Sequence, residues 1–355
     1  MRSSLIKQTI IDLFPTTMPI NIKGSPGGGK TAICTAAGRE LAERISPDAE
    51  YVYYRGSKFA GRWTKGDFGF ATVHTPLMMV EDMVGFPQLL GHADAEKVVE
   101  YSLAPYWPTL NGPQYGILLF DDRGQASADI QKVIANIEYA RNLNGRSLPD
   151  GWTVVSTSNL VTDKAGANRT LTHLEDREWT LHYEVHVDDL VRYALESGWE
   201  PLIPAFLNFR PLHAYDFDAN REKNATARGW EDVSRAMKII PDISYELVRG
   251  RVGDGAASEF IGFKNIWDKL PDIDTVLSHP TTASVPSDPA TLYALAGAIA
   301  AKATMLNFDS VIKYADRMPA EFSVLTMNYS LRRDGSLANA KGFANWAIAH
   351  QHVMF

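Results

Sequence analysis

Residues Gly24 to Thr31 read GSPGGGKT, and no other segment constrains the fold of this chain as strongly. They fit the pattern G-x-x-x-x-G-K-[ST], in which glycine backbone N–H groups curl around phosphate oxygens. An apolar segment ending in Ile20, Asn21 and Ile22 precedes the pattern, and the helix-forming run TAICTAAGRELAERI follows it. A strand, a glycine-rich loop and a helix in this order predict a phosphate-binding loop, with the positive end of the helix dipole facing the anion.

Within this loop, each residue type has a chemical role. Lys30 is expected to reach the β- and γ-phosphates of a nucleotide, and the Thr31 hydroxyl to bind Mg²⁺. The predicted cofactors are therefore ATP and Mg²⁺. The residues predicted to bind the nucleotide are Ser25, Pro26, Gly27, Gly28, Gly29, Lys30, Thr31 and Ala32. The alternative, a glycine-rich turn before an ordinary helix, is disfavoured by the flanking strand and helix.

The composition indicates a folded chain of several domains. At about 150 residues per domain, its 355 residues are enough for two or three. Hydrophobic residues make up 45% and charged residues 22%, which supports a sizeable core. The net charge of −7 argues weakly against a protein that coats nucleic acid, although it leaves room for a local basic pore.

Several other protein classes are not expected. The single cysteine, Cys34, cannot form an internal disulfide, and no His/Cys cluster has the spacing of a zinc site. The N-terminus lacks the apolar region of a signal peptide, and no apolar run reaches the roughly 20 residues of a membrane span. We therefore expect a soluble, cytoplasmic protein, in a bacterium or a phage-infected host, that makes no membrane contact.

Apolar runs in the first half of the chain alternate with helical segments. Besides the strand before the glycine-rich loop (about 18–23), four segments are predicted as strands, namely YVYYR (51–55), QYGILLFDD (114–122), WTVVSTSN (152–159) and WTLHYEVHV (179–187). Asn144-Gly145 is a tight-turn signal and predicts a β-hairpin. Residues 56–113 are rich in glycine, proline and aromatics and are left unassigned, and from Asp188 onward the pattern is helical. Near-continuous apolar strands alternating with helices predict an α/β fold with a parallel sheet.

The predicted architecture is thus a P-loop NTPase core with a parallel sheet and helices on both faces. A small helical lid and a mostly helical C-terminal extension follow it. The expected boundaries are 1–188 for the α/β domain, 189–250 for the lid and 251–355 for the extension. The polar stretch SHPTTASVPSDPA (278–290) is predicted to be a linker or surface loop.

Polar residues follow two of the predicted strands. Asp121 and Asp122 end the run ILLFDD, where Asp121 can orient Mg²⁺ and Asp122 can polarise an attacking water. Asn159 ends the next strand, and its amide can hold a water by donating and accepting at once. In isolation, two acids after a strand are often a solvated turn, and an asparagine there is more often a cap.

Arginine is the natural partner of a transferring phosphoryl group, because its planar fork spreads positive charge. Arg169 and Arg177 precede the last predicted strand, and Arg228 begins the helix of TARGWEDVS. Most arginines are simply solvated, so these three are candidates only through the resemblance that follows.

The segments GSPGGGKT, ILLFDD, LNGRSLPDGW, STSN, LEDREW and ARGWEDVS occur in this order. Together they resemble the MoxR-type branch of the AAA+ ATPases, particularly its phage and prophage versions, over roughly residues 1–245. The resemblance implies a homo-oligomeric, hexameric ring that binds ATP between neighbours. It also implies that Asn159 is sensor 1, Arg177 the trans-acting arginine finger and Arg228 sensor 2, with Arg169 a second interface arginine.

The resemblance further implies an ATPase that remodels or activates a protein substrate, or a partner with a von Willebrand factor A domain. The alternatives are a nucleic-acid motor or loader, which the acidic charge makes the less favoured reading, and a nucleotide-gated scaffold with slow turnover. The sequence departs from the family pattern at Asp122 (usually Glu), Glu178 (often Phe) and Ala227 (often Pro). With the first departure, either a backbone adjustment brings the shorter carboxylate close enough or turnover is slow. The other two departures are expected to affect packing more than chemistry.

Overall fold

The computed structural model of the chain describes residues 1–46, 51–54, 66–90, 98–108, 112–163 and 176–352. These residues form two compact units, Met1–Glu184 and Val185–Phe355. Each unit is described by itself.

A six-stranded sheet forms the centre of the first unit. Its order is β10-β1-β9-β6-β3-β2, and every neighbouring pair in it is parallel. The strands are β1 (Ile20–Lys23), β2 (Tyr51–Tyr54), β3 (Phe68–His74), β6 (Tyr115–Asp121), β9 (Gly151–Ser158) and β10 (Trp179–His182). Because all strands run the same way, their carboxyl ends meet at one edge, where ligands bind in open α/β sheets.

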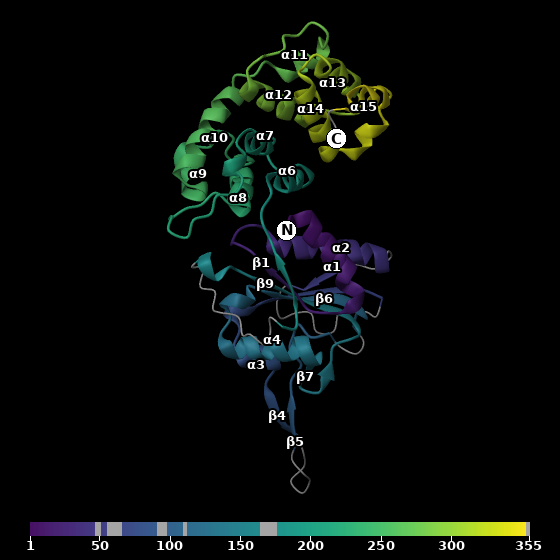
Figure 1. The fold of residues 1–355 in the computed structure, drawn as a ribbon, viewed down its shortest axis with the longest axis vertical. Coiled ribbons are helices and arrows are strands. Elements are labelled where there is room, and N and C mark those ends of the chain that lie inside the picture. The colour runs from purple at the N-terminus through teal and green to yellow at the C-terminus, as the bar shows by residue number, and fades with distance from the viewer. Residues whose placement is uncertain (47–50, 55–65, 91–97, 109–111, 164–175, 353–355) are drawn as a thin grey trace. The chain divides into compact units, whose positions relative to one another are not determined.

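Helices cover both faces of this sheet (Figure 1). On one face α1 (Ser3–Leu13) packs against α2 (Lys30–Ile45), and α2 contacts β3, β6 and β9. On the other face lie α3 (Val80–Val84) and α4 (Ala128–Ala140). The α4 face is built from a cluster of buried apolar residues that includes Leu118, Phe120, Ile130, Ile134 and Trp152.

Two small hairpins leave this layered core. The strands β4 (Pro87–Leu90) and β5 (Val98–Tyr101) pair antiparallel, as do β7 (Asn142–Leu143) and β8 (Arg146–Ser147). The second is the hairpin that Asn144-Gly145 predicts, with φ of 51° and 82° at the two turn residues. The described residues of this unit also form the short 3₁₀ turns η1 (Phe14–Thr16), η2 (Thr75–Leu77), η3 (Arg123–Gln125) and η4 (Val161–Asp163).

The strand β3 lies within the segment that the sequence left unassigned. It is buried between β2 and β6, yet its sequence FGFATVH is interrupted by Gly69. A Cβ on Gly69 would lie 2.4 Å from the Trp152 ring, and one on Gly116 of β6 would lie 2.7 Å from it. The ring of Trp152 therefore packs across two neighbouring strands, and only glycine leaves room for it.

The second unit is helical throughout its described residues. Its helices are α6 (Val187–Glu196), α7 (Leu202–Phe209), α8 (Ala227–Met237), α9 (Tyr245–Val252), α10 (Asp254–Trp267), α11 (Ile273–Ser278), α12 (Pro289–Lys302), α13 (Phe308–Ala315), α14 (Ala320–Arg333) and α15 (Phe343–His350). Two further 3₁₀ turns are η5 (Pro211–His213) and η6 (Gly335–Asn339).

Two hydrophobic clusters hold these helices together. The first joins α6 to α10, with Phe206, Trp230 and Phe260 in mutual ring contact at centroid distances of 5.3 to 5.4 Å. The second joins α11 to α15 around residues such as Phe308 and Leu295. Helices α12 and α14 contribute to both clusters, which connects them into one unit.

The predicted fold class is confirmed, with a parallel sheet, helices on both faces, the glycine-rich loop between β1 and α2, and a helical remainder. The predicted strand over 179–187 is too long, because β10 ends at His182 and α6 begins at Val187. The predicted domain boundaries, including the one at 250, remain predictions. Among the residues described, no helix is long and apolar enough to span a bilayer.

Candidate functional site

The glycine-rich loop connects the carboxyl end of β1 to the first turn of α2. Gly27 and Gly29 have φ of 74° and 93°, a region that favours glycine, and Gly29 precedes the helix without a side-chain cap. A Cβ on Gly24 would lie 2.8 Å from the backbone oxygen of Tyr183, so only glycine fits there as well. Tyr183 directly follows β10, and its hydroxyl donates to the Gly28 carbonyl at 2.7 Å, a contact that supports the loop.

Lys30 is buried beneath this loop. Its ammonium group donates to the carbonyls of Gly24 at 2.7 Å and Ser25 at 3.0 Å, and to Oδ1 of Asn159 at 2.8 Å. The fold thus brings Lys30 and Asn159 together, although 129 positions separate them. Each of these acceptors is a neutral oxygen, so a phosphate offers the ammonium group a stronger, charge-assisted partner.

Thr31 and Asp121 also meet at this edge. The Thr31 hydroxyl donates to Asp121 Oδ1 at 2.9 Å, and the Thr157 hydroxyl donates to the same oxygen at 2.6 Å. His74 Nδ1 lies 3.9 Å from Asp121 Oδ2, and the ligand atoms of His74, Asp121 and Asp122 lie within 4.8 Å of one another. Hydroxyl and carboxylate oxygens are the donors that Mg²⁺ prefers, so the residues present fit a nucleotide-bound magnesium ion.

Asp122 has an unusual backbone conformation, with φ of 55° and ψ of 35°. Its N–H donates to the Thr157 hydroxyl at 2.9 Å, and its carbonyl accepts from the Gln125 N–H at 2.8 Å. A left-handed conformation at a residue other than glycine persists only where its surroundings hold it. The side chain at this position is therefore directed by the turn that follows β6.

Of the three arginines predicted to act on the nucleotide, Arg177 lies in the first unit and Arg228 lies in the second. Arg177 is exposed, and its guanidinium lies 4.2 Å from the ring centroid of Tyr139, which is itself 68% exposed. Arg228 is exposed in the first turn of α8 in the second unit, where Thr226 caps the helix by accepting from the Gly229 N–H at 3.1 Å. Arg169 lies outside the described residues. Of the other loop residues, Pro26 is half-buried and Ala32 is exposed.

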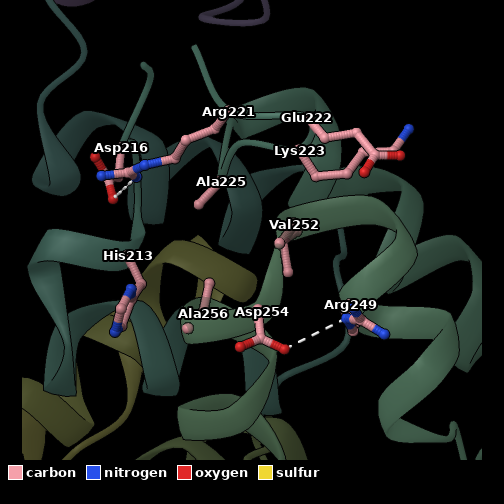
Figure 2. Close-up of a pocket in the computed structure, with 12 residues that line it drawn as sticks. His213, Asp216, Arg221, Glu222, Lys223, Ala225, Arg249, Val252, Asp254 and Ala256 are labelled. Atoms are coloured by element: carbon pink, nitrogen blue, oxygen red, sulfur yellow. Dashed lines mark hydrogen bonds and ion pairs between the residues drawn. The ribbon is translucent and has the colours of Figure 1, made fainter. Parts of the chain in front are cut away.

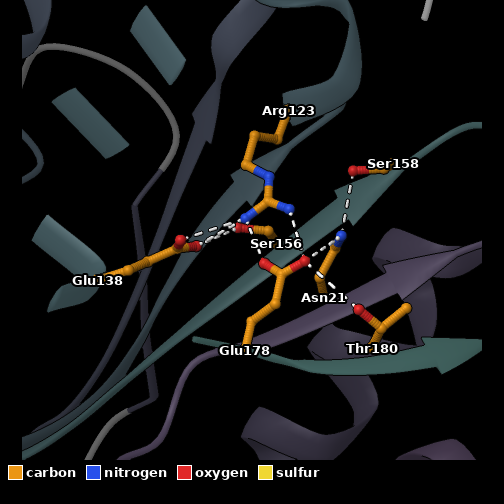
Figure 3. Close-up of polar contacts among 7 residues, drawn as sticks. All are labelled: Asn21, Arg123, Glu138, Ser156, Ser158, Glu178 and Thr180. Carbon is orange, nitrogen blue, oxygen red and sulfur yellow. Dashed lines mark hydrogen bonds and ion pairs between the residues drawn. The ribbon is translucent and has the colours of Figure 1, made fainter. Parts of the chain in front are cut away.

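A buried group of charged side chains near the carboxyl ends of the strands was not predicted from the sequence. We call Arg123, Glu138 and Glu178 the buried triad; their side chains are 1%, 3% and 0% exposed (Figure 3). The Arg123 guanidinium donates to both oxygens of Glu178, at 2.6 and 3.0 Å, and to both oxygens of Glu138, at 3.0 and 3.2 Å. Glu178 thus does more than the packing role expected of it, since it is half of a bidentate ion pair.

Hydroxyl and amide groups complete the surroundings of the triad. Asn21 Nδ2 donates to Glu178 Oε1 at 3.0 Å, and the Ser158 hydroxyl donates to Asn21 Oδ1 at 3.1 Å. The Ser156 hydroxyl donates to Glu138 Oε1 at 3.0 Å. Burial raises the pKa of Glu138 to about 7, an effect that Arg123 opposes and the nearby Glu178 reinforces. These contacts connect β1, β9, η3, α4 and the residue that precedes β10.

A separate polar pocket lies in the second unit (Figure 2). It is lined in part by Arg221, Lys223, Arg249 and Asp254. Of its three lysine and arginine side chains, two have acidic partners in the lining, since Arg221 pairs with Asp216 and Arg249 pairs with Asp254 at 3.3 Å. Because its charges of both signs are balanced in this way, the pocket does not indicate a particular ligand.

Comparison with known proteins adds distant structural likenesses. No protein-family model matches the chain, and no curated protein matches its sequence. Among solved structures, the chain is similar to NtrX from Brucella abortus in complex with ADP, at 13% identity and a TM-score of 0.37. The match covers 99% of this chain and 67% of the NtrX chain. The chain is also similar to the Aeropyrum pernix ORC2 protein in ADPNP–ADP complexes (13% identity, TM-score 0.38, 99% and 84% covered).

A third similar structure is Drosophila ORC bound to DNA, with 12% identity, a TM-score of 0.36, and 79% of this chain and 65% of that chain covered. At these identities and TM-scores, the likenesses assign no function to the chain.

Proposed function

We propose that the chain is an ATPase of the AAA+ type that hydrolyses ATP to ADP and phosphate at a site shared between two copies. The observation that supports this most is the pair of contacts at the edge of the sheet. Lys30 bonds Asn159 at 2.8 Å, and Thr31 bonds Asp121 at 2.9 Å. These are the residue types that binding and hydrolysis of a nucleoside triphosphate require, and they lie together around a glycine-rich loop at a helix N-terminus.

Binding begins with the loop. Backbone N–H groups of the glycine-rich segment and of the first turn of α2 surround the phosphates, and Lys30 exchanges neutral oxygens for charged ones. Thr31 and Asp121 would hold Mg²⁺, which would supply charge neutralisation at the β- and γ-phosphates.

Hydrolysis then requires a positioned water. Asp122 accepts a hydrogen bond from that water, and the Asn159 amide orients it toward the γ-phosphorus. The water oxygen bonds to phosphorus as the bond to the bridging β–γ oxygen breaks, and the proton that the water loses passes to Asp122 and from there to solvent. The products are ADP and inorganic phosphate. Since Asp122 is one methylene shorter than glutamate, we expect turnover to be slow.

The rest of the charge neutralisation comes from arginine. Arg177 is exposed on the surface of its unit, where a neighbouring copy can approach it. We propose that Arg177 completes the site of that neighbour, that Arg228 links the helical lid to the γ-phosphate, and that Arg169 is a second interface arginine. These roles imply a homo-oligomer, for which we propose a hexameric ring of MoxR-like type. Its partner would be a protein substrate or a von Willebrand factor A domain.

The test compares two substitutions by nucleotide binding and by steady-state ATPase activity. Lys30→Ala should abolish nucleotide binding, whereas Arg177→Ala should spare binding and lower turnover by about 10³-fold. Matched controls are Lys132→Ala and Arg39→Ala, which remove exposed basic side chains elsewhere on the same unit. Normal ATPase activity in both test variants would sink the proposal.

The same assay separates the alternatives. Strong stimulation by DNA, with a steep dependence on salt, would favour a nucleic-acid motor. Tight nucleotide binding with negligible turnover would favour a nucleotide-gated scaffold, an alternative that Asp122 in place of glutamate leaves open.

A further inference from the structure

We propose that the Arg123–Glu178 ion pair positions both halves of the hydrolysis site at once, coupling the water-polarising Asp122 to the interface arginine Arg177. The inference rests on the proposed function, because it assumes that Asp122 acts within a copy and Arg177 acts on its neighbour.

Sequence adjacency first points to this coupling. Each member of the buried triad stands next to a residue at or near the surface. Arg123 follows Asp122, Glu178 follows Arg177, and Glu138 precedes Tyr139. The outer residues also meet, since the Arg177 guanidinium lies 4.2 Å from the Tyr139 ring centroid. The inner contacts therefore join three backbone segments, and the outer contact joins two of the same three.

The inner contact is rigid. Arg123 and Glu178 form a bidentate pair at 2.6 and 3.0 Å, and both side chains are almost fully buried. A bidentate pair between a guanidinium and a carboxylate fixes the relative orientation of the two groups as well as the distance between them. Asn21 at 3.0 Å and Thr180 at 3.4 Å also bond Glu178 Oε1, so the backbone beside Arg177 is tied to β1 and β10 (Figure 3).

The same pair restrains Asp122. The residue is held at φ of 55° by the bonds of its N–H and carbonyl, and Arg123 begins the 3₁₀ turn that makes the second of these bonds. If Arg123 loses its partner, the turn loses its buried anchor and the Asp122 carboxylate loses its fixed direction. A change at Glu178 therefore reaches Asp122 through space, although 56 positions separate them along the chain.

An ordinary structural role does not account for this composition. Two buried carboxylates share one guanidinium, and apolar residues of similar volume often replace such groups without loss of stability. A positioning role and a purely structural role predict different effects of substitution on kcat and on the Kd for ATP. Glu178→Gln should lower kcat at least 10-fold while the Kd for ATP changes less than twofold, and Glu43→Gln, an exposed carboxylate on α2, should change neither.

Mixed assemblies separate the two halves. A Lys30→Ala copy donates Arg177 without hydrolysing, and an Arg177→Ala copy hydrolyses without donating, so their mixture has sites completed only across copies. Adding Glu178→Gln to the donor tests Arg177, and adding it to the hydrolysing copy tests Asp122. We expect each addition to lower turnover at least 10-fold relative to the parent mixture.

The outcomes are distinct. A fall only with the altered donor would mean that Glu178 serves Arg177 alone, and a fall in neither arm would mean a purely structural pair; both overturn the coupling. Were the parent mixture itself inactive, the shared site of the proposed function would fail, and the inference with it. Should Glu178→Gln not fold, as judged by its thermal unfolding, Arg123→Lys replaces it in both arms, since lysine keeps the charge but not the fork.

Discussion

The first unit contains two groups of polar side chains, one around the glycine-rich loop and one in the buried triad, and they differ in whether a ligand can replace their contacts. Around the loop, Lys30 bonds neutral oxygens of Gly24, Ser25 and Asn159, all of which a bound phosphate can replace. Beneath it, Arg123 bonds two carboxylates that no ligand can reach. The hydrogen bonds of the first group can be exchanged for bonds to a phosphate, whereas the ion pairs of the second group stay in place when a nucleotide binds. Substitutions in the two groups should therefore affect different quantities. These are nucleotide affinity in the first group and, in the second, the free energy of unfolding together with the turnover that we propose depends on the Arg123–Glu178 pair.

The largest effect is expected from Arg123→Met. It leaves Glu138 and Glu178 buried together without their cation, and breaking a buried pair in this way costs about 3–5 kcal/mol. Urea unfolding without nucleotide measures the free energy of unfolding, with Arg39→Met as the exposed control. A loss below 1 kcal/mol would remove the distinction between the two groups.

Lys30→Met should show the opposite pattern. We expect nucleotide affinity to fall at least 100-fold, which corresponds to about 3 kcal/mol. The free energy of unfolding without nucleotide should change by less than it does in Arg123→Met, because the contacts described for Lys30 are with neutral oxygens and not with buried carboxylates. Titration with a fluorescent ADP and urea unfolding give the two numbers. Loss of folding comparable to that of Arg123→Met would contradict the comparison.

Glu138→Gln sharpens the comparison through pH. Burial raises the pKa of Glu138 from 4.5 to about 7, so the folded chain holds a proton that the unfolded chain releases. The stability from this group is fully present below about pH 4.5 and is lost as the pH rises through 7. Wild type should therefore lose up to about 3 kcal/mol relative to Glu138→Gln between pH 5 and pH 8. Parallel curves of unfolding free energy against pH for the two proteins would be inconsistent with this assignment.

The smallest effect is expected from Tyr139→Leu. Removing an exposed cation–π contact costs about 0.5–1 kcal/mol, so turnover should fall two- to fivefold while nucleotide binding stays unchanged. Tyr115→Leu, at the opposite end of β6 from Asp121, is the control. Steady-state kinetics at saturating ATP provide the measurement, and equal effects in both variants would count against a role for the Arg177–Tyr139 contact.

Much of the first unit was predictable because its signals are local. The glycine pattern, the apolar runs of β6 and β9, and the turn at Asn144-Gly145 each need only a few neighbouring residues. The strand β3 was not found, because the glycine that admits the Trp152 ring also interrupts its apolar pattern. That reason lies in another strand, 83 positions away in the sequence, and no local pattern contains it.

The buried triad was missed for a related reason, although one signal was present. In α4, Ile130 and Ile134 are buried on one side at a spacing of four, and Glu138 continues that series inside the unit. A charge on the apolar side of a helix requires a buried partner. The sequence does not name that partner, because Arg123 and Glu178 reach it only through the folding of the sheet.

The position of Trp152 has a consequence for how substitutions combine. Its ring occupies the space beside both Gly69 and Gly116, which belong to adjacent strands. Either glycine replaced by alanine must displace the same ring, so the second replacement meets a side chain that has already moved. The part of each energetic penalty that comes from the Trp152 ring should therefore be non-additive, with the double variant less destabilised than the sum of the two single variants. A Cβ on Gly116 also lies 2.5 Å from the backbone oxygen of Gly69, and that part of its penalty is not shared.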